Sequence, residues 1–300
     1  MTASTAAPFG RVLTAMVTPF GADGSLDTKA AAQVATHLVD AGNDGLVISG
    51  TTGESPTTSD DEKRRLVEAV LEAVGDRAHV IAGVGTNDTA HSCELARQAA
   101  AAGAHGALVV TPYYSKPPQA GIVAHTVEVA EAGGLPVMVY DIPARTGVKL
   151  SHETLVTLGG HELVVAVKEA SGQFFAGAWV MAETDLAFYS GDDAANLSWF
   201  AHGAVGIVSV VAHVATREYA GMVAALDAGD LVEARRINTQ LLPAVRAIMN
   251  RTQGAMTSKA ALQMLGVLEH RTTRRPLVDL DERELAPLRD DLVAAHLLPA

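Results

Sequence analysis

Short apolar runs and longer amphipathic stretches alternate along most of the chain. The amphipathic stretches place Ala and Leu on one side and charged residues opposite with helical spacing, as in 28–41, 60–74, 89–102 and 119–132. The apolar runs are short and rich in Val, which is typical of strands buried in a parallel sheet. Eight strands are predicted, at 12–17, 45–49, 80–84, 107–110, 136–140, 163–167, 187–189 and 206–210.

Similar glycine-containing turns connect three of the helices to the strands that follow them. They lie at 41–46, 102–107 and 202–207, and each has glycine in its second position: Gly42, Gly103 and Gly203. Because a helix often ends with a residue at positive φ, which glycine adopts without steric cost, these positions are predicted helix ends.

Eight strand–helix units predict an α/β fold, a closed (β/α)8 TIM barrel. An open, doubly wound sheet would give the same alternation, so the pattern alone leaves it as an alternative. Beyond residue 215 the strands stop, and helices are predicted at 230–250, 258–265 and 282–296. We expect a barrel over 1–215 and a C-terminal helical extension over 216–300, packed as part of the same unit.

The composition limits which kinds of partner the protein could bind and in which cellular compartment it could work. Asp and Glu outnumber Lys and Arg by 34 to 22, and no basic run is interleaved with aromatic residues, so nucleic acid is not an expected partner. The one cysteine, Cys93, has no partner for an internal disulfide, which fits a reducing cytoplasm. Neither a signal peptide nor an apolar run of about 18 residues is present, so no membrane association is expected.

Unusual polar residues follow several of the predicted strands. In a (β/α)8 barrel the carboxyl ends of the strands carry the chemistry, so these residues should share one rim. The sixth strand runs directly into Lys168. The others lead into Gly50-Thr51-Thr52-Gly53-Glu54-Ser55, Thr111-Pro112-Tyr113-Tyr114, Tyr140-Asp141-Ile142-Pro143-Ala144-Arg145-Thr146-Gly147 and Ser190-Gly191-Asp192-Asp193.

Lys168 is the candidate nucleophile. A lysine at the inner end of an apolar strand loses hydration, which lowers its pKa, and a neutral amine can attack a ketone to form an imine. The imine then withdraws electrons and makes the neighbouring carbon an enamine nucleophile, so a 2-keto acid can react without a metal. The alternative is a lysine that only pairs with Glu169.

The other rim residues suit the same chemistry, although each has a plainer explanation when taken alone. The 50–55 loop offers N–H groups and hydroxyls for a carboxylate, or is a simple turn. Tyr140 and Tyr114 could pass a proton through Thr51, or fill the core and rim. Arg145 could clamp a second carboxylate, or lie on the surface.

Two further sequence features could suggest a nucleotide cofactor or a metal site, but neither matches the required pattern. Segment 83–88 follows a strand but lacks the third glycine of a dinucleotide fingerprint. The eleven histidines are scattered, without two ligands on one helical face. We therefore expect neither a bound cofactor nor a metal.

With these motifs in their order and spacing, nearly the whole chain resembles the dihydrodipicolinate synthase family of the N-acetylneuraminate lyase superfamily. The resemblance implies condensation of pyruvate with L-aspartate-4-semialdehyde in lysine and diaminopimelate biosynthesis. It also implies a homotetramer built from two tight dimers, in which Tyr114 reaches into the neighbouring subunit's site.

The resemblance also implies a role for each site residue. Lys168 forms the pyruvate imine, and Tyr140, Thr51 and Tyr114 form the proton relay. The implied substrate-binding residues are Thr52 for the pyruvate carboxylate, Arg145 for the aldehyde's carboxylate, Gly191 and Val208.

One region departs from the lysine-inhibited members of this family. Their inhibitor pocket has an acidic residue where this chain has His91, and Pro56, Asp60 and Lys63 also differ, whereas Asn87 and Tyr113 match. We expect free lysine to inhibit weakly or not at all, unless Asp60 or Asp88 replaces the missing carboxylate.

Two other functions remain open from the sequence. A sister aldolase acting on a sugar-derived 2-keto acid would share the imine apparatus, although Arg145 argues against it. A catalytically silent barrel used for binding would have lost at least one imine-forming group, and none is missing.

Overall fold

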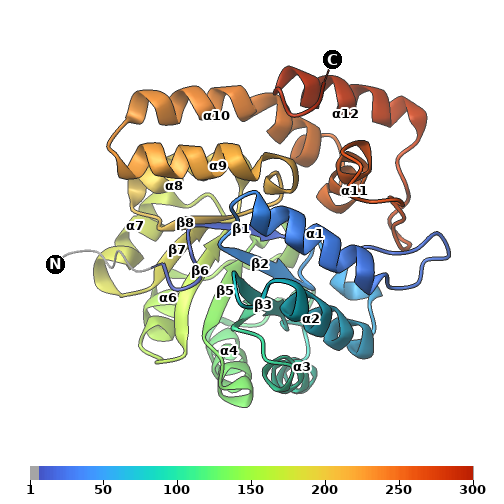
Figure 1. The fold of residues 1–300 in the computed structure, drawn as a ribbon. Helices are drawn as coiled ribbons and strands as arrows, with labels where there is room; N and C mark the ends of the chain where they lie inside the picture. Colours follow the sequence, from blue (N-terminus) through green and yellow to red (C-terminus); the bar gives the residue numbers. More distant parts are fainter. Residues whose placement is uncertain (1–6, 300) are drawn as a thin grey trace.

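Eight parallel strands form a closed barrel. The computed structural model describes residues 7–299, and the strands pair in chain order, with β8 returning to β1 (Figure 1). The predicted barrel is confirmed, and the open-sheet alternative is wrong. The strands are β1 (Val12–Ala15), β2 (Gly45–Ile48), β3 (His79–Gly83), β4 (Gly106–Val110), β5 (Val137–Asp141), β6 (Val164–Glu169), β7 (Ala187–Ser190) and β8 (Gly206–Ser209).

Helices connect consecutive strands and surround the barrel (Figure 1). Side-chain caps fix several of their first turns; α2, for example, begins with a reciprocal capping box between Ser59 and Glu62. The helices in this part are α1 (Thr28–Asp40), α2 (Asp60–Val74), α3 (Thr89–Ala101), α4 (Gln119–Gly133), α5 (Pro143–Thr146), α6 (His152–Gly159), α7 (Phe174–Glu183) and α8 (Asn196–His202), with short 3₁₀ turns η1 (Ser55–Thr57) and η2 (Asp193–Ala195).

The core has two parts because successive strand residues point to opposite faces of the sheet. On β2, Leu46 and Ile48 pack outward against residues of α1 and α2, whereas Val47 packs inside the barrel against residues of β1 and β3. Both faces of the strands are therefore apolar, which explains their continuous hydrophobic runs.

The predicted glycine turns are confirmed. Gly42, Gly103 and Gly203 have φ values of 110°, 92° and 107°, a region that side chains with a Cβ rarely enter. Each glycine reverses the chain at the end of a helix and leads it into the next strand.

The chain after β8 is helical, and its helices pack on one another beside the barrel (Figure 1). Figure 1 shows α9 between the barrel and α10, and α9 contacts β1 and β8. These elements are α9 (Ala212–Asp227), α10 (Leu231–Val245), the π-helix η3 (Arg246–Asn250), α11 (Gly254–Met264) and α12 (Glu282–Ala294).

Three details differ from the sequence prediction. Helix α9 was not among the predicted helices, and Ala215 inside it has non-helical angles that interrupt its periodicity. The stretch predicted as one helix at 230–250 changes to a π-turn shortly after Pro243. Helix α11 begins at Gly254 instead of residue 258, because the Gln253 side chain caps the helix there by accepting from the N–H of Ala255.

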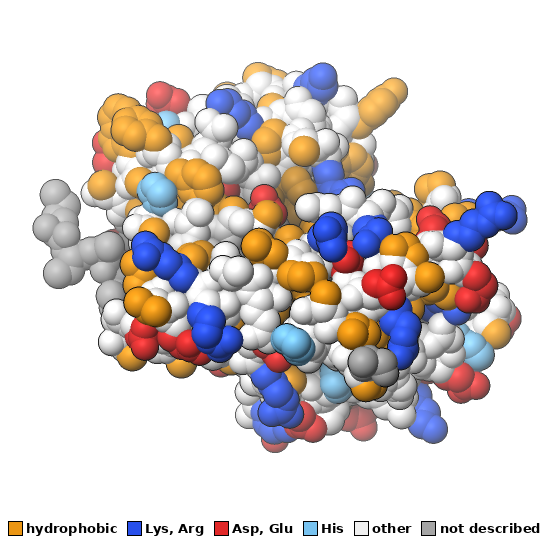
Figure 2. Space-filling view, turned by 90° about the horizontal axis from the view of Figure 1, so that it is seen from above, with side chains coloured by type: hydrophobic (Ala, Val, Ile, Leu, Met, Phe, Trp, Pro, Cys, Tyr) orange, Lys and Arg blue, Asp and Glu red, His pale blue; other side chains and the backbone are white. Residues whose placement is uncertain are grey.

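The visible surface carries no large block of one charge. On the face shown in Figure 2, basic and acidic side chains are interspersed and hydrophobic side chains form small separate patches. Among the helices within residues 7–299, none combines the length and apolar character needed to cross a membrane.

Candidate active site

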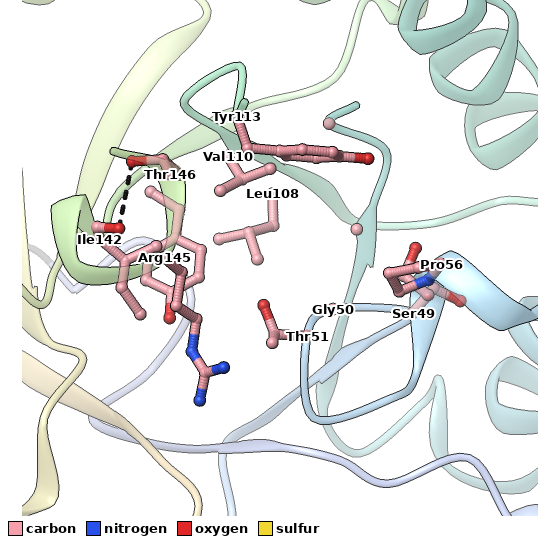
Figure 3. A pocket seen from close by; sticks show the side chains of 14 residues that line it. Ser49, Gly50, Thr51, Pro56, Leu108, Val110, Tyr113, Ile142, Arg145 and Thr146 are labelled. Atoms are coloured by element: carbon pink, nitrogen blue, oxygen red, sulfur yellow. Dashed lines mark hydrogen bonds between the residues drawn. The ribbon is translucent and has the colours of Figure 1, made fainter. Parts of the chain in front are cut away.

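A cavity of about 240 Å³ opens at the carboxyl ends of the strands. It is lined by residues at the ends of β2 to β5 and in the loops that follow them, including Tyr140. Figure 3 shows Thr51, Tyr113 and Arg145 around it. Lys168, Thr52, Gly191 and Val208 are not among the residues that line this cavity, and Lys168 adjoins it through the ring of Tyr140.

Lys168 lies within β6, one residue before its end, and is 4% exposed. It pairs in register with Tyr140 of β5 and Tyr189 of β7, and its Nζ is 4.3 Å from the centre of the Tyr140 ring. Burial lowers the pKa of Lys168 to about 8; Asp193 opposes this effect and Arg145 adds to it. A substantial fraction of the amine is therefore neutral near pH 8.

Glu169 does not pair with Lys168, so the structural alternative for this lysine is wrong. Its carboxylate instead accepts the backbone N–H groups of Ser171 at 2.9 Å and Gly172 at 3.3 Å. Adjacent strand residues face opposite sides of the sheet, and Lys168 forms no ion pair within residues 7–299.

Of the other two implied substrate-binding residues, Gly191 packs against this lysine and Val208 lies on β8. A Cβ on Gly191 would lie 2.9 Å from Cγ of Lys168, so any larger residue would push the lysine stem aside. Val208 is fully buried on β8 among the residues that fill the barrel interior.

Asp193 is a buried acid that the sequence analysis placed on the rim without a role. One of its carboxylate oxygens accepts the N–H groups of Val210 at 2.8 Å and Val211 at 3.1 Å, and the other accepts the Ser209 hydroxyl. Burial raises the pKa of Asp193, and these hydrogen bonds oppose that rise. The position of Asp193 right after β7 was the only sequence signal for it.

The loop after β2 holds Thr51 and Thr52. Thr51 lines the cavity and Thr52 is 9% exposed. The loop is closed by hydrogen bonds from the N–H of Glu54 to the carbonyl of Thr51 at 3.1 Å and from the N–H of Ser55 to that of Gly50 at 3.2 Å. It is thus an ordered turn that places Thr51 at the cavity, whereas Thr52 is not part of the cavity lining.

The two candidate tyrosines of the relay lie in different environments. Tyr140 lines the cavity, and burial raises its pKa while Arg145 opposes the rise. Tyr114 has a φ of 73° and is 89% exposed, and the neighbouring Tyr113 lines the cavity instead. Within residues 7–299 no hydrogen bond joins the hydroxyls of Thr51, Tyr114 and Tyr140, so a single chain does not assemble the complete relay.

Arg145 lies on α5, a single turn that begins at Pro143. Figure 3 shows its side chain reaching into the cavity toward the part where Thr51 lies. The Thr146 hydroxyl donates to the carbonyl of Ile142 at 3.1 Å and helps to fix this turn. Arg145 is thus available to an anionic group entering the cavity.

The acidic residues close to His91 are already engaged. The His91 Nε2 lies 3.0 Å from the Asp60 carboxylate, and the Asp88 carboxylate caps α3 by accepting the N–H of His91 at 3.3 Å. Asp60 and Asp88 thus both lie beside His91, each already in contact with it.

No metal centre is formed in the part of the chain that the structure describes. Residues 7–299 contain no group of three or more His, Cys, Asp and Glu side chains placed to hold a metal ion.

Comparisons with a family model, with curated relatives and with solved structures all point to the same family. The model of the Dihydrodipicolinate synthetase family matches residues 8–295. The 4-hydroxy-tetrahydrodipicolinate synthase of Kineococcus radiotolerans is 64% identical over 293 residues, which cover 98% of this chain and 95% of that protein. The enzyme of the same name from Acidothermus cellulolyticus is 61% identical, with 96% and 93% covered.

The fold comparison gives the same result. The crystal structure of the Cyanidioschyzon merolae enzyme with lysine bound superposes with a TM-score of 0.94 at 40% identity, covering 97% of this chain and 99% of that one.

The chain therefore belongs to the dihydrodipicolinate synthetase family, whose fold here is a TIM barrel with C-terminal helices. Its activity is that of a 4-hydroxy-tetrahydrodipicolinate synthase, a lyase of lysine and diaminopimelate biosynthesis. The alternatives of a sugar-acid aldolase and a silent barrel are wrong.

Proposed function

We propose that Lys168 joins pyruvate through an imine and that the resulting enamine attacks L-aspartate-4-semialdehyde. The observation that carries this assignment is the buried amine of Lys168 beside Tyr140, with its pKa lowered to about 8. A neutral amine adds to the keto carbon, water leaves, and loss of a methyl proton gives the enamine. The enamine carbon forms a bond to the aldehyde carbon, and the aldehyde oxygen takes up a proton.

The loop after β2 would hold the carboxylate of pyruvate. Thr51 and Thr52 supply hydroxyls and N–H groups there, and an anion is well matched to such donors. Gly191 leaves room for the substituted lysine, and Val208 supplies an apolar contact inside the barrel. These roles rest on the resemblance of the motifs together with their position around one site.

Proton transfer would pass through Tyr140 and Thr51 to Tyr114 of the neighbouring subunit. The exposure of Tyr114, 89%, supports this arrangement because its phenol lies away from its own chain's cavity. Burial keeps Tyr140 protonated at neutral pH, so it is suited to donate a proton and recover it.

Arg145 would bind the carboxylate of L-aspartate-4-semialdehyde. Its guanidinium reaches into the cavity from α5 (Figure 3), and a planar fork of donors matches a carboxylate. The amino group of that substrate can then attack the imine carbon, which releases Lys168 and closes the ring of the product.

The assembly that fits this relay is a homotetramer made of two dimers. Besides Tyr114, the surface of α7 exposes Phe175 at 79% and Trp179 at 51%, and neighbouring exposed aromatic side chains are typical of protein interfaces. We place the enzyme in the cytoplasm, in agreement with its single, buried cysteine, Cys93.

Two measurements test the proposal. Borohydride reduction in the presence of pyruvate, followed by peptide mass spectrometry, should locate the adduct on Lys168 and find none in Lys168→Ala. A coupled assay should show turnover with pyruvate and L-aspartate-4-semialdehyde, but no cleavage of sialic acid or 2-keto-3-deoxygluconate. An adduct on another lysine would refute the assignment.

A further inference from the structure

A fully buried ion pair connects the loop after β2 to the C-terminal helices. Nζ of Lys259 on α11 lies 2.5 Å from Oε1 of Glu54, and the two side chains are 0% and 1% exposed. Neither residue lines the cavity, and they are 205 positions apart in the sequence. A charge pair so completely removed from water needs a reason other than solubility.

Both ends of the pair are held by further contacts. The Lys259 ammonium donates to the carbonyl of Thr272 at 2.8 Å, and the N–H of Arg274 donates to Oε2 of Glu54 at 2.9 Å. Both cations lie over the ring of Phe20, with Nζ of Lys259 4.1 Å and Cζ of Arg274 4.2 Å from the ring centre. The position of the Glu54 carboxylate is therefore strongly determined.

The backbone of Glu54 transmits this position to the active site. Glu54 has φ 54° and ψ 37°, a left-handed conformation that is unfavourable for a residue with a side chain. Its N–H donates to the carbonyl of Thr51. Because only two residues separate them, a shift of the Glu54 backbone would displace Thr51, which lines the cavity, and its neighbour Thr52.

Stability alone does not account for such a pair. Removing two charges from water costs about as much as their attraction returns, and apolar side chains of similar size often stabilise a protein equally well. The pair does, however, specify one position for the loop, which apolar contacts would do less strictly.

We propose that Glu54 and Lys259 are positioning residues that hold Thr51 and Thr52 in the geometry that binds the carboxylate of pyruvate. The C-terminal helices thereby contribute to the pyruvate site without touching the substrate. This inference rests on the proposed role of the loop in pyruvate binding.

Steady-state kinetics of Glu54→Gln, Lys259→Met and the double variant test this inference. Each variant should raise the KM for pyruvate by roughly 10-fold, since small misplacements of binding groups are costly. Because Thr51 also belongs to the proposed proton relay, kcat at saturating pyruvate should fall as well, whereas the KM for the aldehyde, whose carboxylate is assigned to Arg145, should stay close to that of the parent. The double variant should resemble the single ones, because all three remove the same interaction.

Asp291→Asn is the matched control. Asp291 on α12 is 5% exposed and lies 2.5 Å from the guanidinium groups of Arg246 and Arg251, which are 63% and 31% exposed, so the control breaks an ion pair of the C-terminal helices that is less buried than the Glu54–Lys259 pair. It should lower stability and leave the KM for pyruvate unchanged. An equal rise in this control, or folded Glu54 and Lys259 variants with the parent KM, would overturn the inference.

Hydrogen exchange of the unaltered enzyme gives a second test that needs no variant. Pyruvate should slow exchange at the amides of 50–55 and, together with them, at the amide of Arg274, which is bonded to Glu54. Slowing confined to 50–55 would contradict the coupling. If the parent forms no borohydride adduct with pyruvate, the proposed function fails instead, so the two failures are distinct.

Discussion

Replacing Lys168 by methionine should abolish the pyruvate adduct and make the protein more stable. Methionine fills a similar volume without a charge, whereas the lysine must be buried at 4% exposure. The pKa of Lys168 falls from 10.5 to about 8 on folding, mainly through this burial. At 1.36 kcal/mol for each pH unit, the charged lysine costs the folded state about 3 kcal/mol.

Because folding lowers the pKa of Lys168, the stability gained by Lys168→Met should depend on pH. Below pH 8 the lysine is charged in both the folded and the unfolded state, so the parent bears the full cost. Between pH 8 and 10.5 the folded lysine loses its proton while the unfolded one retains it, so the stability of the parent rises with pH. The advantage of Lys168→Met should therefore be greatest at neutral pH and shrink across this window.

Urea unfolding at pH 7 and at pH 10, at one fixed protein concentration, measures the difference. Lys149→Met is the control, because Lys149 is exposed and should show neither the gain nor its pH dependence. A Lys168→Met protein that is no more stable than the parent at pH 7 would contradict the predicted cost of burying the charge. A stability gain of equal size at both pH values would contradict it as well.

Three other predictions concern the substrate, regulation and assembly. Arg145→Ala should lower kcat/KM for the aldehyde by about 30- to 150-fold through loss of a charge-assisted contact, while borohydride still traps pyruvate; unchanged aldehyde kinetics would exclude the role. L-Lysine should inhibit weakly, because His91 replaces an acid and already contacts Asp60; half-inhibition below about 1 mM would be inconsistent with this. Phe175→Glu should weaken subunit assembly, as measured by sedimentation velocity. If Tyr114 completes the relay of the neighbouring subunit, mixing the inactive Tyr114→Phe and Lys168→Ala chains should restore activity.

Most of the barrel could be predicted from the sequence because its signals are local. Apolar runs flanked by amphipathic stretches determine where strands and helices form. Gly42, Gly103 and Gly203 mark helix ends because glycine alone adopts a positive φ without steric cost. Lys168 could be singled out for the same reason: a lysine that follows an apolar run is chemically unusual within a window of a few residues.

The bounds of the C-terminal helices were less predictable. Ala215 departs from helical angles inside α9, and η3 adopts a π-turn after α10. Such irregularities are set by packing against the barrel and against one another, which periodicity does not encode. The assignment of these helices to the same unit as the barrel stays a proposal, supported by the contacts of α9 with β1 and β8.

The sequence by itself determined the order of strands and helices, the rim residues and the candidate nucleophile, because each depends on short-range patterns. Only the tertiary structure decided which side chains meet. Glu54 and Lys259 each look like ordinary surface charges, and the burial that makes them a pair arises when α11 packs beside the loop after β2. Likewise, the sequence suggests that the pKa of Lys168 is lowered. The size of this shift depends on how completely the eight strands exclude water around the amine.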